Sequence, residues 1–352
     1  MFLSGLDTRL GLTMTMPIEI QTVRLRLRPV LARDEAAVVA ALDDFAVAKW
    51  LAVVPFPYTV ADFQVFLTGI AVPGEVWLIE DAQGFAGIIS LLPELGYWLG
   101  TRAQGLGYMT EAARAILATA FAGDAALTVP SGYFVGNGPS SNVLTKLGFV
   151  ETGRDTRANR AQAAMLPHVV LQLSRQDFVA ALPVAARSAR LAYRSIQPVD
   201  FAALHAIGSD WSVVRQLGSW PWPPEPDFTT IHAKPYGGIG FAWGMFLDGA
   251  MIGTVAVTDA IMGYSLLPAH WRQGYGEEAA RTAIAHAFAA TDLARIAASV
   301  WYDNAASLGL LIKLGFAETG RTVEMSKARK VEVELVHLVL DRAVWPPHHP
   351  AA

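Results

Sequence analysis

The sequence predicts a mixed α/β fold that occurs twice in tandem. Three observations predict it. The chain matches itself at a constant offset, each copy alternates segments of strand and helix character, and 352 residues with 53% hydrophobic side chains are enough for two separate cores. Strands and helices in this order give a mixed sheet flanked by helices.

The internal repeat is the strongest signal in the chain. Gly96-Tyr97 recurs as Gly263-Tyr264, so the offset is 263 − 96 = 167 residues, and it holds without a gap through Gly153-Arg154. With one gap, the match extends upstream to Arg24-Leu25, which faces Arg190-Leu191. A unit of about 165 residues exceeds the repeats of solenoid proteins, so the chain carries a duplicated domain.

We expect the two domains at residues 17–178 and 188–345, with an Ala-rich linker at 178–187. Residues 1–16 are interpreted as an extension or a misplaced start, because Met14 and Met16 lie just before the fold. A monomeric pseudo-dimer and a homodimer are both compatible with this organisation.

The front half of a copy is predicted as a strand, a helix and a hairpin. Residues 22–29 alternate as in a strand, and residues 34–42 have helical character. Strand-like runs at 76–79 and 85–91 are joined by the turn-forming residues 81–84, which predicts a hairpin.

The back half begins with a strand at 95–99 and a long helix at 107–121. Met109, Ala113, Ile116 and Ala120 line one face of that helix. The remaining elements are a strand, a short helix and two terminal strands, at 127–135, 141–147, near 149 and at 169–173.

Composition excludes several classes of protein. Without cysteine the chain has neither disulfides nor a thiolate nucleophile, and we expect it in the reducing cytoplasm. A net charge of −4 and scattered basic residues argue against a nucleic-acid partner, and Arg24, Arg26 and Arg28 are interpreted as a solvated strand face.

The sequence also predicts neither a membrane span nor a metal site. It contains no uninterrupted run of about 18 apolar residues, which is the length that a membrane-spanning helix needs. No pair of histidines has metal-ligand spacing, so we expect no metal.

A glycine-containing segment lies where a strand ends and the long helix begins. It reads Gln104-Gly105-Leu106-Gly107-Tyr108-Met109 in the first copy and Trp271-Arg272-Gln273-Gly274-Tyr275-Gly276 in the second. Glycines let the backbone approach a ligand, and the free amides of a helix start favour an anion such as a pyrophosphate. The spacing fits neither a P-loop nor a dinucleotide-binding fingerprint.

A second pattern follows about thirty residues later in each copy. Asn-x-x-Ser precedes Lys-Leu-Gly-Phe-x-Glu-Thr-Gly-Arg, with Asn137 and Ser140 in the first copy and Asn304 and Ser307 in the second. The asparagine is expected to cap the N-terminus of a helix, and this structural role is compatible with a functional one.

At these residues the sequence resembles the GNAT superfamily of N-acetyltransferases, in its Rim-type branch. The signature of that branch is (Q/R)-x-x-G-x-(G/A), commonly seen as Q-G-x-G-Y-(A/M)-T-E-A, followed by N-x-x-S and K-L-G-F. The resemblance covers both copies. It implies an acyl-CoA-dependent N-acyltransferase that takes acetyl-CoA and an amine substrate, either a protein N-terminus or a small molecule. The cofactor-binding residues that it implies are Leu99, Gln104, Gly105, Leu106, Gly107, Tyr108, Met109, Asn137, Arg272, Gln273, Gly274, Tyr275, Gly276 and Asn304.

The expected reaction is direct attack of a neutral amine on the thioester carbonyl, which needs a base and an acid. Glu94 is the candidate base, because strand alternation places it on the face of Gly96; the second copy has Ile261 there. The tyrosine that many GNAT enzymes carry two residues before the Lys of K-L-G-F is absent, which leaves Ser140 and Ser307 as candidate acids.

Two alternatives stay open at this stage. One is an acyl-CoA-binding sensor or scaffold without turnover. The other is a single active domain beside a degenerate structural one.

Overall fold

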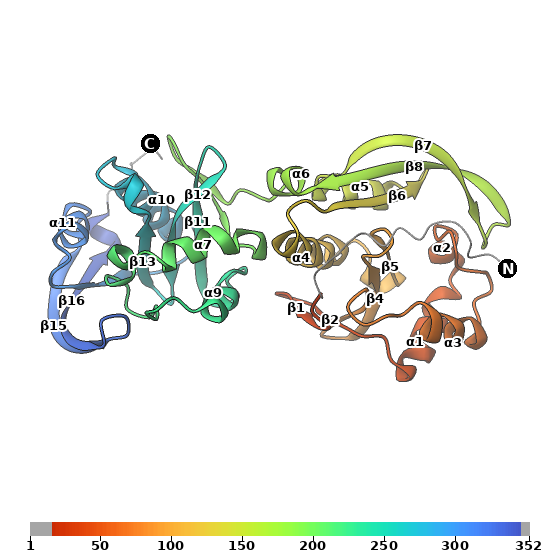
Figure 1. The fold of residues 1–352 in the computed structure, drawn as a ribbon, viewed down its shortest axis with the longest axis horizontal. Helices are drawn as coiled ribbons and strands as arrows, with labels where there is room; N and C mark the ends of the chain where they lie inside the picture. Colours follow the sequence, from red (N-terminus) through yellow and green to blue (C-terminus); the bar gives the residue numbers. More distant parts are fainter. Residues whose placement is uncertain (1–15, 346–352) are drawn as a thin grey trace. The chain divides into compact units, whose positions relative to one another are not determined.

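A computed structural model describes residues 16–345, which divide into two compact units between Leu182 and Pro183 (Figure 1). Each unit contains both helices and a mixed or antiparallel set of strands, so the predicted α/β class is confirmed. No helix within residues 16–345 is long and apolar enough to cross a membrane.

The first unit has two sheets. One has the order β1-β2-β3-β4-β5 and the other β6-β8-β7. The strands are β1 (Ile20–Gln21), β2 (Arg26–Arg28), β3 (Val76–Asp81), β4 (Gly84–Ser90), β5 (Gly96–Leu99), β6 (Thr128–Phe134), β7 (Val150–Asn159) and β8 (Ala164–Ser174). The helices are α1 (Glu35–Leu42), α2 (Phe45–Ala48), α3 (Val60–Gly69), α4 (Tyr108–Gly123), α5 (Gly138–Leu147) and α6 (Arg175–Ala180).

The two sheets of this unit meet at a single point, which we call the apex. There Leu95 forms a parallel bridge with Ser131, its N–H donates to the Pro130 carbonyl at 2.9 Å, and the Ser131 hydroxyl donates to the Leu95 carbonyl at 2.8 Å. Beyond the apex β5 pairs with β4 and β6 pairs with β8, so the two strands diverge. A gap between strands leaves backbone groups without a ladder partner, and such groups need a ligand or water.

The two faces at this gap differ in the helices that cover them. Trp98 packs with Phe85 against the core cluster built by α1 and α3, whereas its neighbour Tyr97 points the other way and contacts Ser140 of α5. We call these the α1 face and the α5 face. Alternation along β5 therefore assigns each side chain near the apex to one face.

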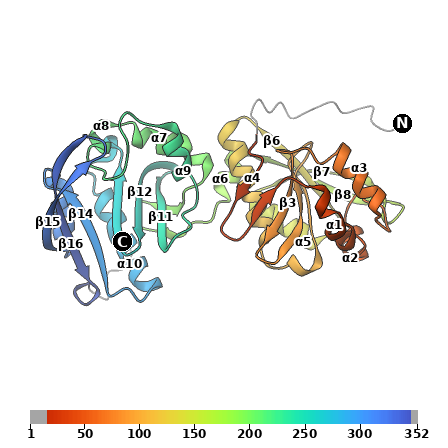
Figure 2. The same cartoon turned by 90° about the horizontal axis from the view of Figure 1, so that it is seen from below.

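The second unit repeats the plan with one continuous sheet of order β15-β16-β14-β13-β12-β11-β10-β9 (Figure 2). Its strands are β9 (Ala186–Arg187), β10 (Ala192–Ser195), β11 (Gly240–Leu247), β12 (Ala250–Thr258), β13 (Ile261–Leu266), β14 (Arg295–Trp301), β15 (Ala317–Ser326) and β16 (Val331–Asp341). Its α-helices are α7 (Phe201–Gly208), α8 (Trp211–Val214), α9 (Pro226–His232), α10 (Tyr275–Ala290) and α11 (Ala305–Lys313).

The apex of the second unit is at the position that the repeat predicts. Strands β13 and β14 pair in parallel at Ile261 with Ala297 and at Met262 with Ala298, and 298 − 131 is again 167. The preceding turn differs. Asp259 and Ala260 have φ of 50° and 63°, which closes a tight hairpin, whereas the first unit has the longer loop 91–95 with a cis Leu92-Pro93 bond.

Two expectations need correction. The predicted strand 22–29 contains only the short β2, because Thr22 and Leu25 form a turn before it. The solvated face is wrong for Arg28, whose side chain is 5% exposed and bonds both carboxylate oxygens of Asp34 at 2.8 Å. Arg194 makes the same buried pair with Asp200 in the second unit.

Other boundaries moved by a few residues. The short helix begins at Gly138 rather than residue 141, because the Asn137 side chain caps it. Within the predicted linker, Phe178 is buried against Phe121 in the first unit, and β9 pairs with β10 in the second. The expectation for residues 1–16 lies almost wholly outside the described residues.

Candidate active site

The glycine segment of the first unit forms a loop whose amides face away from the helix that follows. Gly105 and Gly107 have φ of 76° and 79°, values that favour glycine, and Gly107 is the N-cap residue of α4. The first helical hydrogen bond runs from Glu111 N–H to the Gly107 carbonyl at 3.1 Å. The amides before Glu111 therefore lack helical acceptors, and with the helix dipole they are suited to bind an anion.

The second unit repeats this loop geometry. Arg272 and Gly274 have φ of 59° and 84°, Gly274 caps α10, and Glu278 N–H donates to the Gly274 carbonyl at 3.0 Å. Arg272 holds a left-handed conformation without being glycine, which costs about 1 kcal/mol or more. The retention of that conformation indicates that the loop shape is required there too.

An arginine in the turn before β2 clasps the loop in the first unit. Arg24 donates from Nη1 to the Leu106 carbonyl at 2.9 Å and from Nε to Glu111 Oε2 at 2.7 Å, and its guanidinium lies 4.8 Å from the Tyr108 ring centroid. Thr22 Oγ1 donates to Glu111 Oε1 at 2.7 Å. The clasp occupies the Leu106 carbonyl, which leaves the loop amides to face a ligand.

The same clasp recurs in the second unit. Arg190 donates from Nη1 to the Gln273 carbonyl at 2.9 Å and from Nε to Glu278 Oε2 at 2.7 Å, and it lies 4.2 Å from the Tyr275 ring. Ser188 takes the place of the threonine and donates to Glu278. The two arginines align in the sequence, but nothing in the sequence pattern gave them a role.

The end of β5 is tied to the loop by a side chain. Gln104 Nε2 donates to the Leu99 carbonyl at 2.9 Å, and in the second unit Trp271 Nε1 donates to the carbonyl of Leu266 at 2.7 Å. Gln273 instead donates to the Ala269 carbonyl at 2.9 Å. Different residue types thus fix the same strand end.

The remaining loop residues contribute shape. Met109 is buried in the first core, and a Cβ atom on Gly276 would lie 3.7 Å from a Leu310 methyl group. A Cβ atom on Gly105 would meet nothing within 4 Å, so the space above the loop is open.

A hydroxyl pair lies on the α5 face beside the gap. Tyr97 Oη is 3.0 Å from Ser140 Oγ, and Asn137 Oδ1 accepts from Ser140 N–H at 3.2 Å as the N-cap of α5. Burial raises the pKa of Tyr97, and the hydrogen bond from Ser140 opposes this only in part, so the phenol stays protonated. Because the cap uses Oδ1 of Asn137, its Nδ2 is the atom that can donate to a ligand.

The second unit has the same pair. Tyr264 Oη is 2.8 Å from Ser307 Oγ, burial raises the pKa of Tyr264, and Asn304 caps α11 through Ser307 N–H at 3.1 Å. Neither tyrosine was predicted from the sequence as a site residue. The signal was present, because Gly-Tyr anchors the repeat, but only the fold shows that this tyrosine reaches the serine forty-three residues later.

Charged groups of the first unit gather at the apex on the α1 face. Glu94 accepts two hydrogen bonds from Arg157 Nη1, at 2.9 and 3.1 Å, and Asp155 Oδ1 lies 2.9 Å from His168 Nδ1. Register pairing of His168 with Asp155 puts both on one face. Among the described residues, no group of three His, Asp or Glu side chains could hold a metal ion.

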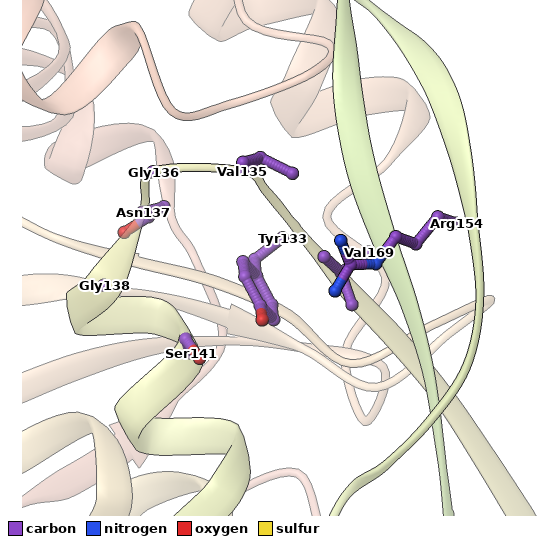
Figure 3. Close-up of a pocket in the computed structure, with 8 residues that line it drawn as sticks. All are labelled: Tyr133, Val135, Gly136, Asn137, Gly138, Ser141, Arg154 and Val169. Carbon is purple, nitrogen blue, oxygen red and sulfur yellow. The ribbon is translucent and has the colours of Figure 1, made fainter.

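A shallow hollow of about 300 Å³ lies on the other side of α5 (Figure 3). Its lining includes Tyr133, Asn137 and Arg154, and Figure 3 shows Tyr133 between the first turn of α5 and the Arg154 side chain. Of the site residues predicted from the sequence, its lining contains Asn137 and none of the glycine loop. The loop and the gap, rather than this hollow, bring the predicted residues together.

The gap thus separates two sets of groups. Glu94 lies on the α1 face with the charged cluster, whereas Ser140 lies on the α5 face with Tyr97. The anion-binding loop sits between them in sequence, at the end of the strand that bears Tyr97.

Comparison with known proteins agrees with the duplicated plan. The family model described as the acetyltransferase (GNAT) domain matches twice, at residues 24–150 and 190–317. The chain is similar to the uncharacterized N-acetyltransferase YoaA of Bacillus subtilis, with 43% identity over 61 residues, and to the uncharacterized N-acetyltransferase p20 of Bacillus licheniformis, with 35% over 82 residues. These alignments cover 17% and 23% of this chain, and 34% and 46% of the relatives.

Two solved structures are similar to part of the chain. RimJ of Mycobacterium smegmatis, in complex with CoA-disulfide, is 23% identical, covering 44% of this chain and 83% of its own, with a TM-score of 0.38. An acetyltransferase of the GNAT family from Bacillus anthracis is 18% identical, covering 44% and 96%, with a TM-score of 0.38. The two family matches span most of the chain, which therefore belongs to the acetyltransferase (GNAT) domain family and carries two copies of that domain.

Proposed function

We propose that this protein transfers the acetyl group of acetyl-CoA to a primary amine, on a protein N-terminus or a small molecule. The observation that carries the proposal is the twofold occurrence of one arrangement: a loop with free amides at the end of a strand that diverges from its neighbour, with a partly buried hydroxyl pair beside the gap. A loop that served only to start a helix would not need the repeated arginine clasp.

The residues fit acetyl-CoA on the grounds of space and donor chemistry. The pyrophosphate would bind the amides of Leu106 to Met109, or of Gln273 to Gly276, where open space above Gly105 admits it. Arg24 and Arg190 add positive charge next to these amides. The pantetheine arm would lie between β5 and β6 or between β13 and β14.

Acetyl-CoA supplies a thioester carbonyl with a good leaving group. Backbone amides at the edge of the gap would stabilise the charge that develops on the carbonyl oxygen. The protonated Tyr97 and Ser140 hydroxyls lie on one side and can give a proton to the leaving thiolate. Glu94, the sequence-based candidate base, lies on the other side together with His168.

A continuous assay of thiol release tests the proposal. Acetyl-CoA is supplied with each of three amine probes. They are a short peptide with a free N-terminus, a peptide with a blocked N-terminus and a free lysine side chain, and spermidine. We expect release above the hydrolysis background with at least one probe, and mass spectrometry should show the matching acetylated amine. An acetyl-CoA-binding sensor would bind the thioester and give no amine-dependent release.

The second unit supports the narrower alternative of one active domain beside one that only binds. It has the loop, the clasp and the hydroxyl pair, but Ile261 stands in the place of Glu94. Thiol release from variants in which one loop at a time is blocked will distinguish the two arrangements.

A further inference from the structure

We infer that His168, oriented by Asp155, is the general base that deprotonates the acceptor amine in the first unit. The inference rests on the proposed acetyl transfer and assigns a residue that neither the repeat nor its motifs pointed to. Four observations carry it: the position of the imidazole, the nitrogen it leaves free, the charges around it, and the counterpart residues in the second unit.

The imidazole is buried beside the first residue of β6 after the apex. Ser131 makes the last contact with Leu95, and Gly132 is the next residue of β6. A Cβ atom on Gly132 would come within 2.2 Å of Cε1 and 2.4 Å of Nε2 of His168. The ring therefore covers the first residue at which the strands separate, which is where the thioester carbonyl would enter.

The ring is held with one nitrogen toward Asp155. Nδ1 lies 2.9 Å from Asp155 Oδ1, and the edge of the ring contacts Phe134 with centroids 5.6 Å apart. A carboxylate at that distance fixes the proton on Nδ1, which leaves the Nε2 lone pair to accept a proton. The histidine base of a Ser-His-Asp triad divides the roles of its two nitrogens in the same way.

The surroundings keep the ring neutral. Burial lowers the pKa of His168, and the Arg157 guanidinium lowers it further, whereas Asp155 and Glu94 act in the opposite direction without cancelling the shift. Both carboxylate oxygens of Glu94 accept from Nη1 of Arg157. Glu94 is therefore assigned as the residue that positions Arg157, and the proton of the acceptor amine goes to Nε2 of His168.

The proton balance is simple. The ammonium form of the acceptor gives one proton to His168 Nε2, and the resulting amine nitrogen forms a bond to the acetyl carbon. The carbon–sulfur bond breaks and its electron pair leaves on the CoA sulfur. The nitrogen loses its second proton to water. The thiolate takes a proton from Tyr97 through Ser140, solvent reprotonates Tyr97, and His168 returns its proton to water.

The second unit lacks this arrangement. The offset of 167 places Leu335 at the position of His168 and Thr322 at that of Asp155, and these two are register partners as well. His337 lies nearby, but its Nδ1 is 3.2 Å from Ser299 Oγ and its Nε2 is 2.8 Å from Thr322 Oγ1. Both nitrogens are thus occupied by hydroxyls, and His337 serves as a matched control.

The test compares His168→Asn, Asp155→Asn, Glu94→Gln and the control His337→Asn in the full chain, with acetyl-CoA and the best of the three amine probes. We expect His168→Asn to lower kcat/KM by about 100-fold. It should also remove the acid limb of the pH profile, which is the fall in kcat/KM at low pH that protonation of the base causes. Asp155→Asn should keep a weaker limb, and His337→Asn should match the wild type. Calorimetric binding of acetyl-CoA should stay the same in all four.

Three results would overturn the inference. One is a His168→Asn variant with the wild-type pH profile, and another is loss of the limb in Glu94→Gln but not in His168→Asn. The third needs no variant: NMR of the wild-type imidazoles at pH 7.5 should show His168 neutral with the proton on Nδ1, and a proton on Nε2 would exclude the role. If the wild type binds acetyl-CoA but acetylates no probe, the proposed function itself fails.

Discussion

At the scale of single residues, the hydroxyl pair on the α5 face shows how a side chain acquires a role through its neighbour. Tyr97 is partly buried, with its phenol 3.0 Å from Ser140 Oγ, and this burial raises its pKa. Each hydroxyl therefore keeps its proton at neutral pH and can pass it toward the gap. The tyrosine of the GNAT pattern is missing, with Leu144 in its place, and the phenol beside Ser140 comes from Tyr97 of β5.

Ser140→Ala and Tyr97→Phe should each lower the rate of thiol release about 10- to 100-fold, because each removes one member of a proton path. The affinity for acetyl-CoA should change little. Thr145→Ala, an exposed hydroxyl on the same helix, is the control. Equal loss of binding and turnover in both variants would show that the pair only shapes the site.

A second residue-scale feature is the buried pair of Arg28 with Asp34, which Arg194 and Asp200 repeat. Removal of one partner leaves an uncompensated buried charge, and such a loss costs about 3 to 5 kcal/mol. Arg28→Met should therefore shift the urea unfolding of the first unit to lower denaturant, while the exposed Arg26→Met should not. An unchanged midpoint for Arg28→Met would contradict the burial of this pair.

At the scale of elements, the loop is held by the turn that precedes β2. Burial acts to raise the pKa of Glu111, and the hydrogen bonds from Thr22 and from Arg24 outweigh it, so the pKa is lowered; the same holds for Glu278, with Ser188 and Arg190 as donors. A lowered carboxyl pKa adds stability that is complete above the unfolded value of 4.5 and is lost as the pH falls through the folded value.

Glu111→Gln should therefore reduce the drop in stability between pH 5 and the acid transition and should weaken acetyl-CoA binding in the first unit. Thermal unfolding across that range measures the first effect, and titration at pH 7 the second. The exposed Glu19→Gln is the control, because Glu19 pairs with Arg26 away from the loop. Parallel stability curves for Glu111→Gln and the wild type would contradict the clasp.

How far the sequence predicts these elements depends on how local their causes are. The long helix, the hairpin and the glycine loop were predicted because spacing and turn residues act within a few positions. Ser140 with Tyr97, and His168 with Asp155, are brought together by strand pairing between distant segments. No periodicity along the chain encodes that pairing, so the α1 face of the site was not predicted beyond Glu94.

At the scale of the whole molecule, duplication has kept one half of the site and changed the other. Loop, clasp and hydroxyl pair occur in both units, and the charged cluster at the apex occurs in the first. We therefore predict two acetyl-CoA sites per chain and turnover from the first unit. Family membership alone would not distinguish the two units.

The most direct test is a calorimetric titration of the full chain with acetyl-CoA, repeated with Gly107→Trp, Gly274→Trp and both. Gly249→Trp is the control, since Gly249 has a φ of 82° and open space but lies in a hairpin turn away from the loops. We predict two sites in the wild type and the control, one in each single variant and none in the double variant. Two sites in either single variant, or none in the wild type, would contradict the two-site arrangement.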